Sequence, residues 1–334
     1  MARTTTTIDE DAFRAIVEDH RAQLHAHCYR MLGSVHDADD ALQDTLLRAW
    51  RGLPKFGGRS ALSSWLYRIA TNACLDLIER RGKRILPADH GPPSAPAIEN
   101  GEPLIESVWV EPYPDQGVED GHAAPHARYE QREAVELAFV ASLQHLPATQ
   151  RAVLIMRDVL GFSARETAEA LDTTSVSVNS ALQRARENVA ERVPEQSQQA
   201  TLRELGDVRV RDLVQAYLDA WASADVDTLK TLLAEDAVFS MPPWSAWWQG
   251  RDALTDLAKM VHGKCRETRS VPTRANGQVA MAHYGLDPDT GRWTASAIDV
   301  FTFEGDTIKE ITAFVTPEVF PSFGLAPALA PTEY

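Results

Sequence analysis

The sequence predicts a multidomain protein, with two all-α domains followed by an α+β domain. Residues 8–84 and 129–194 place hydrophobic side chains at the three- and four-residue steps of amphipathic helices. A stretch rich in proline and acids separates these two regions. Residues 207–327 combine an amphipathic helix with alternating, aromatic-rich segments typical of strands.

Composition narrows the class of protein. The 334 residues are 44% hydrophobic and 24% charged, which is enough apolar mass for more than one core and excludes collagenous, wholly disordered and disulfide-scaffold proteins. No apolar run approaches the roughly 18 residues of a membrane helix, and the N-terminal segment has no apolar signal-peptide core. The cysteines Cys28, Cys74 and Cys265 lie far apart. We therefore expect a cytoplasmic protein with no membrane segment, metal or cofactor.

The net charge of −15 argues against nonspecific binding of nucleic acid, unless the charge is unevenly placed. It is uneven: residues 8–47 carry nine acids and three arginines, whereas residues 48–84 carry nine bases and two acids. Salt screens each charge beyond about 10 Å, so a local basic pole can still hold phosphates. The alternative is ordinary charge scatter over solvated helix faces.

The segment 37–51 predicts a helix with an acidic outer face. Its apolar or small residues form one stripe, and Ser34 is a suitable N-cap. The stripe consists of Ala38, Ala41, Leu42, Thr45, Leu46, Ala49 and Trp50. The opposite face carries Asp40, Gln43, Asp44 and Leu47. An acidic face with an exposed leucine suits a basic protein partner, although a solvated surface would give the same pattern.

The segment 60–81 predicts a second helix with a face suited to unpaired bases. Arginine can hold phosphates, amides can bind base edges and aromatic rings can stack on bases. The residues of this face are Ser64, Tyr67, Arg68, Thr71, Asn72 and Asp76. Phe56 lies in the basic loop 55–59 just before it, where the ring could contact bases or fill the core.

Residues 85–128 predict an extended linker, because eight prolines remove helix donors and eight acids repel one another. Helical periodicity then returns. Ser163 and Glu166 form a capping-box pattern, and the turn 172–174 precedes another helix. This arrangement predicts a helix-turn-helix over residues 163–182, with a structural helical hairpin as the alternative. The residues that would face a DNA groove are Ser177, Asn179, Ser180 and Arg184, with Arg186 beside them.

Together these pieces resemble a bacterial RNA polymerase sigma factor of the extracytoplasmic-function (ECF) group. The matching stretches are DADDALQDTLLRAW, SALSSWLYRIATNACLDLIERR and LPATQRAVLIMRDVLGFSARETAEALDTTSVSVNSALQRAR, in the family's order. The resemblance implies sigma region 2 at residues 8–84 and sigma region 4 at residues 129–194. It implies a non-enzymatic factor that brings core RNA polymerase to promoters and starts transcription. The partners implied are the clamp helices of the largest polymerase subunit, the polymerase flap and partly single-stranded promoter DNA.

The resemblance also implies three sets of site residues. The polymerase-binding set is Asp40, Ala41, Leu42, Gln43, Asp44 and Leu47. The set that would melt and bind the −10 promoter element is Phe56, Arg59, Ser64, Trp65, Tyr67, Arg68, Thr71, Asn72, Arg80 and Arg81. The set for the −35 element is Ser175, Ser177, Asn179, Ser180, Gln183, Arg184 and Arg186. Asn179 and Ala181 stand where the family often carries Lys and Arg, which predicts a weaker phosphate grip.

After a second expected linker at residues 195–206, residues 207–327 resemble a SnoaL-like domain of the NTF2-like fold, an α+β cone around a pocket. The matching stretches are VQAYLDAWASADVDTLKTLLAEDAVFSMPPW, QGRDALTDLAK and WTASAIDVFTFEGDTIKEITAFVTPEVFPSFGL. Candidate pocket residues are Trp244, Trp248, His283, Trp293 and Asp299, with Trp247, Asp236 and Tyr284 as further candidates. The resemblance implies regulation of sigma activity in cis, with an unidentified small ligand. The alternative is a SnoaL-type isomerase or cyclase fused to a DNA-binding module.

Overall fold

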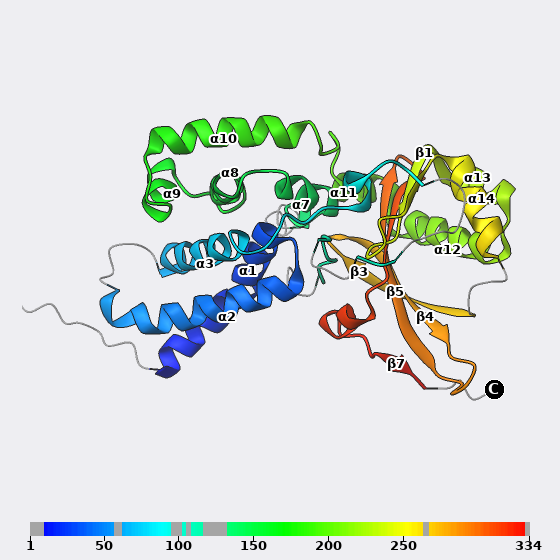
Figure 1. The fold of residues 1–334 in the computed structure, drawn as a ribbon, viewed down its shortest axis with the longest axis horizontal. Coiled ribbons are helices and arrows are strands. Elements are labelled where there is room, and N and C mark those ends of the chain that lie inside the picture. The colour runs from blue at the N-terminus through cyan, green and yellow to red at the C-terminus, as the bar shows by residue number, and fades with distance from the viewer. Residues whose placement is uncertain are drawn as a thin grey trace, which may run out of the picture. The chain divides into compact units, whose positions relative to one another are not determined.

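The computed structural model describes residues 10–56, 62–94, 102–104, 108–115, 132–262 and 267–330 (Figure 1). The chain divides into two compact units. The helical unit combines residues 1–84 with residues 116–193, and the C-terminal unit combines residues 85–115 with residues 194–334. In the described part of the chain, no helix is long and apolar enough to cross a membrane.

The helical unit contains two sets of helices. The first set is α1 (Glu10–Leu32), α2 (Val35–Gly52), the 3₁₀ turn η1 (Leu53–Lys55) and α3 (Leu62–Ile78). The second set is α7 (Leu137–Gln144), α8 (Ala148–Leu154), the π-helical turn η2 (Ile155–Val159), α9 (Ala164–Ala170) and α10 (Ser175–Ala190). Helix α8 continues directly into the π-helical turn.

The expected caps form in both sets, and the stripe of α2 is buried or half-buried except at its end, where Trp50 is 43% exposed and its expected place in the core is wrong. The Ser34 side chain accepts a hydrogen bond from the Asp37 amide, 3.1 Å away, and begins α2. Ser163 and Glu166 form the predicted capping box at α9. The described stripe residues of α10 are buried at Val178, Leu182 and others, which leaves the opposite face to solvent.

Hydrogen bonds to backbone oxygens join the two helix sets within the helical unit. Arg30 Nε donates to the Ala134 carbonyl over 2.9 Å, and Gln144 Nε2 donates to the Arg30 carbonyl over 3.2 Å. Arg151 donates to the Met31 carbonyl at the end of α1. These bonds satisfy carbonyls near a helix C-terminus that lack an intrahelical partner.

The C-terminal unit is a mixed sheet, and helices α12, α13 and α14 cover one of its faces (Figure 1). Its helices are α4 (Pro87–His90), α11 (Gln198–Leu205), α12 (Asp207–Ser223), α13 (Val226–Leu232), α14 (Arg251–Val261) and the 3₁₀ helix η3 (Pro317–Phe323). Its strands are β1 (Leu233–Ser240), β2 (Trp247–Gln249), β3 (Thr268–Ala275), β4 (Gln278–Leu286), β5 (Trp293–Glu304), β6 (Thr307–Phe314) and β7 (Ala328–Leu329).

The strand order is β2-β1-β6-β5-β4-β3, with β7 paired to β5. Strands β1 and β6 are parallel, and the other neighbours are antiparallel. The predicted β5–β6 hairpin forms, with Glu304 opposite Thr307 and Gly305 at φ 56°, where a side chain would be strained. Helices α12, α13 and α14 share a hydrophobic core with β1, β5 and β6.

Two segments expected as linkers contribute to the C-terminal unit. Trp109 and Val110 are buried, and Asp115 accepts from Arg274 Nε at 2.9 Å and from the Gly277 amide at 2.7 Å. The stretch 195–206 differs from the expected linker because it contains α11. Gln198 in α11 exchanges two hydrogen bonds with the backbone of Phe303, at 2.9 and 2.8 Å.

Candidate functional site

The outer face of α2 carries the candidate polymerase-binding residues. Asp40, Gln43 and Leu47 are exposed, and 54% of the Leu47 surface is open to solvent. Ala41 and Leu42 are buried against the other helices, so the assignment of these two side chains to a docking surface is wrong. They belong to the apolar stripe of α2, which faces the core because its steps of three and four match the helical repeat.

Ion pairs moderate the charge of this face. Asp44 contacts Arg48 at 2.6 Å, and Arg48 also contacts Asp76 of α3 at 2.9 Å. The Asp40 carboxylate lies 3.5 Å from Arg81. These pairs are largely exposed, so each is expected to contribute little to stability. They do form a row of alternating acids and bases that runs from α2 to α3.

An open pocket of about 320 Å³ lies beside this row. Its lining combines cations, an amide and aromatic rings: Arg48, Gly52, Phe56, Trp65, Arg68, Ile69 and Asn72. The Phe56 and Trp65 rings are 4.9 Å apart at an angle of 39°. Phe56 is half-buried, packs against Trp65 and lines the pocket, and its contact with bases stays a prediction. Arg68 and Asn72 are exposed at the pocket, and Ser64 is half-buried nearby.

Two residues of the expected −10 set are inaccessible in this arrangement. Tyr67 is 7% exposed, and its ring contacts Phe162 edge-on at 5.8 Å. Thr71 is buried, donates to the Tyr67 carbonyl at 2.7 Å and contacts His27 Nε2 at 2.9 Å. Sequence periodicity placed both on an outer face, but α1 and the second helix set cover that face. Burial raises the pKa of Tyr67 to about 12 and lowers the pKa of His27 to about 3.

The remaining basic residues of the −10 set occupy different environments. Arg80 is exposed after α3. Arg81 forms ion pairs with Asp37 and Asp40, and is therefore engaged within the helical unit. Trp65 is largely buried, although it lines the pocket. Arg59 lies outside the described residues.

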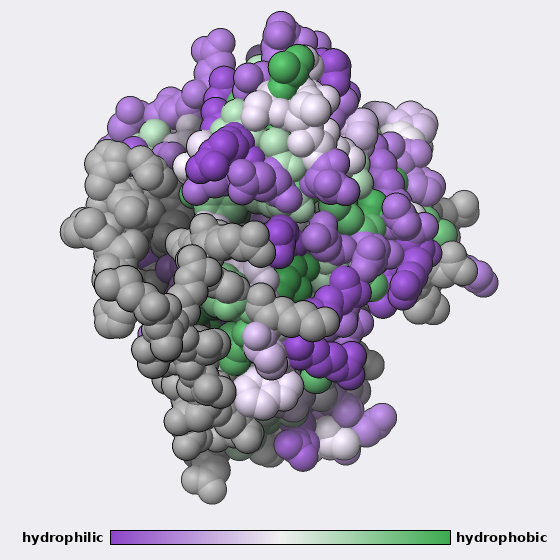
Figure 2. Space-filling model, turned by 90° about the vertical axis from the view of Figure 1, so that its left-hand side faces the viewer, coloured by the Kyte–Doolittle hydropathy of each residue, from purple (hydrophilic) through white to green (hydrophobic). Residues whose placement is uncertain are grey.

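The second helix of the helix-turn-helix presents the expected −35 surface. Thr174 caps α10 through the Ser177 amide at 3.1 Å. All candidate residues are exposed: Ser175, Ser177, Asn179, Ser180, Gln183, Arg184 and Arg186. Arg186 donates to both oxygens of Asp158, at 2.8 and 2.7 Å, which fixes its guanidinium against η2. Figure 2 shows mostly hydrophilic surface at this end of the molecule, with small separate hydrophobic patches.

In the C-terminal unit, His283 and Asp299 come together from β4 and β5. His283 Nε2 lies 3.1 Å from Asp299 Oδ2, and His283 Nδ1 lies 2.9 Å from Ser270 Oγ. Burial alone would lower the pKa of His283, but the Asp299 carboxylate raises it above its ordinary value. Burial, with the Asp299 charge, also raises the pKa of Tyr217.

The other candidate pocket residues contact groups other than His283 and Asp299. Trp248 is 1% exposed in the core, with Trp244 packed against the same core. Trp293 lies at the start of β5, opposite Leu286 and Leu329. Asp236 pairs with Lys309 at 2.5 Å, Tyr284 donates to the Ala326 carbonyl at 3.0 Å, and Trp247 donates to the Gly91 carbonyl at 2.9 Å.

Sequence reasoning missed the buried polar contacts that organise the helical unit. Asp37 accepts from Arg84 at 2.6 Å, and Arg151 donates to Gln144 Oε1 at 2.5 Å. The sequence offered one signal for the Asp37–Arg84 contact. Residues 80–84 are rich in bases, and an acid, Asp37, stands in the first turn of an expected helix. Across the described ranges, no group of His, Cys, Asp or Glu could hold a metal ion.

Comparison with known proteins agrees with both units. Family models match as Sigma-70 region 2 over residues 16–84, Sigma-70 region 4 over residues 136–189, and the SnoaL-like domain over residues 214–311. The chain is 40% identical over 322 residues to the ECF RNA polymerase sigma factor SigG of Mycobacterium tuberculosis, covering 95% of this chain and 85% of SigG.

Two further relatives cover different shares of the chain. SigM of Mycobacterium tuberculosis is 36% identical over 182 residues, which is 54% of this chain and 77% of SigM. The crystal structure of the extracytoplasmic function sigma factor SigJ of Mycobacterium tuberculosis matches the fold with a TM-score of 0.60 at 19% identity, covering 94% of this chain and all of SigJ. By its sequence similarity over nearly the whole chain, this protein belongs to the ECF RNA polymerase sigma factors, in a form that carries a C-terminal SnoaL-like domain.

Proposed function

We propose that the outer face of α2 anchors this sigma factor to core RNA polymerase, and that the pocket beside it receives an unpaired promoter base. The protein is a non-enzymatic transcription factor that binds core polymerase and promoter DNA and starts transcription at specific promoters. The observation that carries the residue-level proposal is the pocket lined by Phe56, Trp65, Arg68 and Asn72, next to an exposed acidic helix face.

The docking part rests on exposure and charge. Asp40, Gln43 and Leu47 are exposed on successive turns of α2, so one partner surface could contact all three. An exposed leucine surrounded by acids suits an apolar site with a basic rim, because the charges direct association and the leucine fills a pocket. Asp44 adds an acid that is already paired with Arg48.

The base-binding part rests on the chemistry of the pocket lining. A base that leaves the duplex loses stacking, and an aromatic wall restores about 1–3 kcal/mol of it. Phe56 and Trp65 offer that wall, and Asn72 offers both a donor and an acceptor for a base edge. Arg48 and Arg68 lie where a flanking phosphate would need a cation. Tyr67 would join this surface only if its contact with Phe162 opened, and Thr71 only if it also separated from His27 of α1.

The α10 face supports a −35 role for the helix-turn-helix. Ser177, Asn179 and Ser180 are exposed near the N-terminus of α10, the end that enters a major groove in this motif. Arg184 is exposed one turn further on, where it could reach a phosphate. The alternative, a purely structural helical hairpin, gives no reason for this row of short polar side chains.

We further propose that the C-terminal unit regulates the sigma activity in cis and that the protein works in the cytoplasm with its polymerase. A covalently attached regulator has a high effective concentration even when its affinity is low. The segment 85–115 supports this proposal. It belongs to the compact C-terminal unit, and it follows Arg84 of the helical unit directly in the chain. The fused-enzyme alternative has no use for the α2 and α3 surfaces.

The decisive experiment measures core binding and transcription with the full chain. The Leu47→Ser/Gln43→Ala double variant should bind purified core polymerase at least tenfold more weakly, and a Phe56→Ala variant should bind core normally but open promoter DNA poorly. Val208→Ser removes an exposed hydrophobic side chain from α12 in the other unit and serves as the matched control. Undiminished core binding by the double variant would show that the α2 face is not the anchor.

A further inference from the structure

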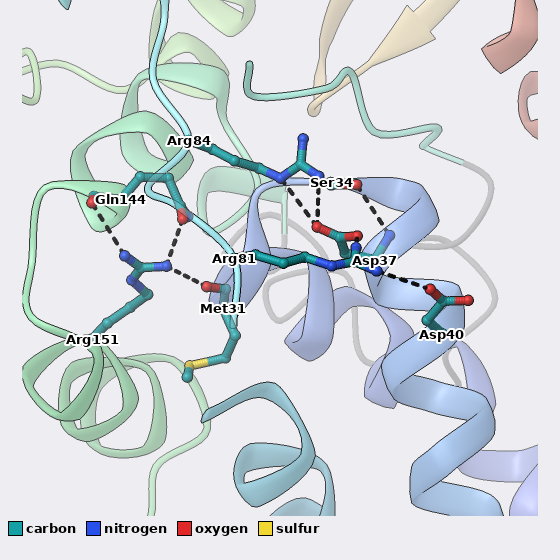
Figure 3. Close-up of polar contacts among 8 residues, drawn as sticks. All are labelled: Met31, Ser34, Asp37, Asp40, Arg81, Arg84, Gln144 and Arg151. Atoms are coloured by element: carbon teal, nitrogen blue, oxygen red, sulfur yellow. Dashed lines mark hydrogen bonds and ion pairs between the residues drawn. The ribbon is translucent and has the colours of Figure 1, made fainter. Parts of the chain in front are cut away.

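A second cavity, of about 330 Å³, lies where the two helix sets of the helical unit meet. It is bounded by the end of α1, the first turn of α2, the segment after α3, and the turn from α7 to α8. Figure 3 shows five of the lining residues with their polar contacts: Asp37, Arg81, Arg84, Gln144 and Arg151. Of the residues assigned above to polymerase or promoter binding, Arg81 of the −10 set lines this space.

Cations dominate the polar part of the lining. They are Arg81, Lys83, Arg84 and Arg151, and Lys83 Nζ lies 2.8 Å from His145 Nδ1. Among the described residues that line the cavity, Asp37 is the single acid. Its carboxylate already accepts from Arg84 and pairs with Arg81 (Figure 3). The cations come from both helix sets, because Arg151 lies in α8 and the other three follow α3.

Arg151 is the cation that α8 contributes to this lining. It is 4% exposed, and its guanidinium contacts the carbonyls of Met31, Gln144 and Leu146 and the Oε1 atom of Gln144. These are neutral oxygens, and within the described residues Arg151 Nε has no hydrogen-bond partner. Burial lowers the pKa of Arg151 to about 10. A buried cation without a carboxylate is costly, so an anion in the adjoining cavity would relieve that cost.

The opposite part of the lining is apolar. It consists of Leu32, Leu77, Ile78, Leu146 and Pro147. A cavity of this volume is at the small end of the range for small-molecule sites, about 300–1,000 Å³. An apolar wall facing several cations suits a ligand with an apolar or planar body and a phosphate group. Inorganic phosphate alone would leave the apolar wall unused.

We propose that this cavity binds a small phosphorylated ligand of the nucleotide class, with its phosphates between Lys83, Arg84 and Arg151 and its base against Ile78 and Leu146. Such a ligand would contact both helix sets, and would therefore stabilise the contact between them.

Elements near −10 and −35 are about 25 base pairs apart, about 85 Å at 3.4 Å per pair. Because Tyr67 of α3 contacts Phe162 beside α9, binding both elements requires the helix sets to separate. The ligand would oppose that separation.

Titration calorimetry on the full-length protein tests the site without polymerase, so its outcome is independent of the proposed promoter surfaces. The probes are ATP, pyrophosphate, adenosine and a single-stranded oligonucleotide. We expect saturable ATP binding, weaker pyrophosphate binding and no adenosine binding. Lys83→Glu should weaken ATP at least tenfold, whereas Lys259→Glu, an equivalent charge change on the surface of α14, should leave it unchanged.

Hydrogen exchange locates the site. ATP should slow exchange of the α8 amides in the wild-type protein but not in Lys83→Glu. Equal ATP affinity in wild type and Lys83→Glu would overturn the proposal, as would ATP binding that leaves α8 exchange unchanged. Binding of the oligonucleotide with no binding of ATP or pyrophosphate would also overturn it, because the basic surface would then serve nucleic acid. Ala148→Glu adds an acid to the lining and provides a second variant, with the same expected loss.

Discussion

Arg84 donates through Nε and Nη2 to a single oxygen of Asp37, over 3.2 and 2.6 Å, and both side chains are buried. Asp37 lies in the first turn of α2, and Arg84 is the last residue of this part of the helical unit before the C-terminal unit begins. The pair therefore fixes the junction between the two units to the helix that carries the proposed polymerase-binding face. The positive N-terminus of α2 adds to the attraction for the carboxylate.

Removing one member of this pair should destabilise the helical unit strongly. Arg84→Met leaves the Asp37 carboxylate buried with one cation fewer, and loss of one partner of a buried pair costs about 3–5 kcal/mol. Urea unfolding followed by circular dichroism measures the change. Glu169→Gln breaks the exposed Arg165–Glu169 pair of 3.4 Å and should change stability by less than about 0.5 kcal/mol. Similar small losses in both variants would contradict a structural role for the junction.

Much of the helical unit could be predicted from sequence, because its information is local. The Ser34 cap, the Ser163–Glu166 capping box and the apolar stripes depend on residues within two turns of one another. The exposed Asp40, Gln43 and Leu47 follow from the same periodicity. A stripe predicts which side of a helix faces a core, and that was sufficient to find the outer face of α2.

Two of the errors have a common cause in long-range packing. Tyr67 and Thr71 lie on the side of α3 that periodicity left outside, yet contacts with His27 and Phe162 bury them. A single helix can be covered on two sides when it lies between other helices, and one sequence does not reveal the second neighbour. The assignment of Ala41 and Leu42 to a docking surface also placed buried residues outside, but for a local reason: a family motif marks a segment rather than the side chains that reach the surface.

Acid should destabilise the helical unit through His27. Its pKa falls from 6.5 to about 3 in the folded protein, so the unfolded chain binds a proton that the folded protein does not. Stability is fully present above pH 6.5 and is lost as the pH falls towards 3, by about 1.4 kcal/mol per pH unit for one proton. His27→Gln should flatten the dependence measured by unfolding at several pH values. His262→Gln, on the surface of the C-terminal unit, serves as the control.

The C-terminal unit should show the opposite dependence through His283. Its pKa is raised in the folded protein, so the stabilisation is complete below the ordinary pKa of 6.5 and is lost as the pH rises through the raised value. Asp299→Asn removes the carboxylate and should abolish this loss. NMR titration of the His283 ring measures the pKa directly, and an ordinary or lowered pKa in the wild-type protein would contradict the proposed charge contact.

Two residues of α10 should affect −35 binding in different ways. Arg184→Ala removes a cation suited to phosphate, so binding should weaken similarly for all sequences and the salt dependence should fall by about one ion. Asn179→Ala removes a side chain suited to a base edge, at a cost of about 1–3 kcal/mol that depends on one base position. Fluorescence anisotropy with duplexes altered at single positions separates these outcomes. A uniform loss in Asn179→Ala would reassign that residue to the backbone.

The segment 108–115 should remain attached to the C-terminal unit whatever the helical unit does. Asp115 accepts from both Arg274 and the Gly277 amide, while the Asn276 side chain accepts from the Tyr113 amide at 2.9 Å. Asp115→Asn keeps the shape but removes the charge opposite Arg274, so exchange of the amides from Trp109 to Tyr113 should accelerate. Hydrogen exchange by mass spectrometry measures this, with Asp306→Asn in the β5–β6 turn as a control for loss of a surface charge.

If the segment acts as a free tether, the wild-type amides will already exchange at the rate of an unfolded peptide, and the variant will change nothing. Slow exchange in the wild type and faster exchange in Asp115→Asn would instead mean that signals from the C-terminal unit reach Arg84 through an anchored strand of chain.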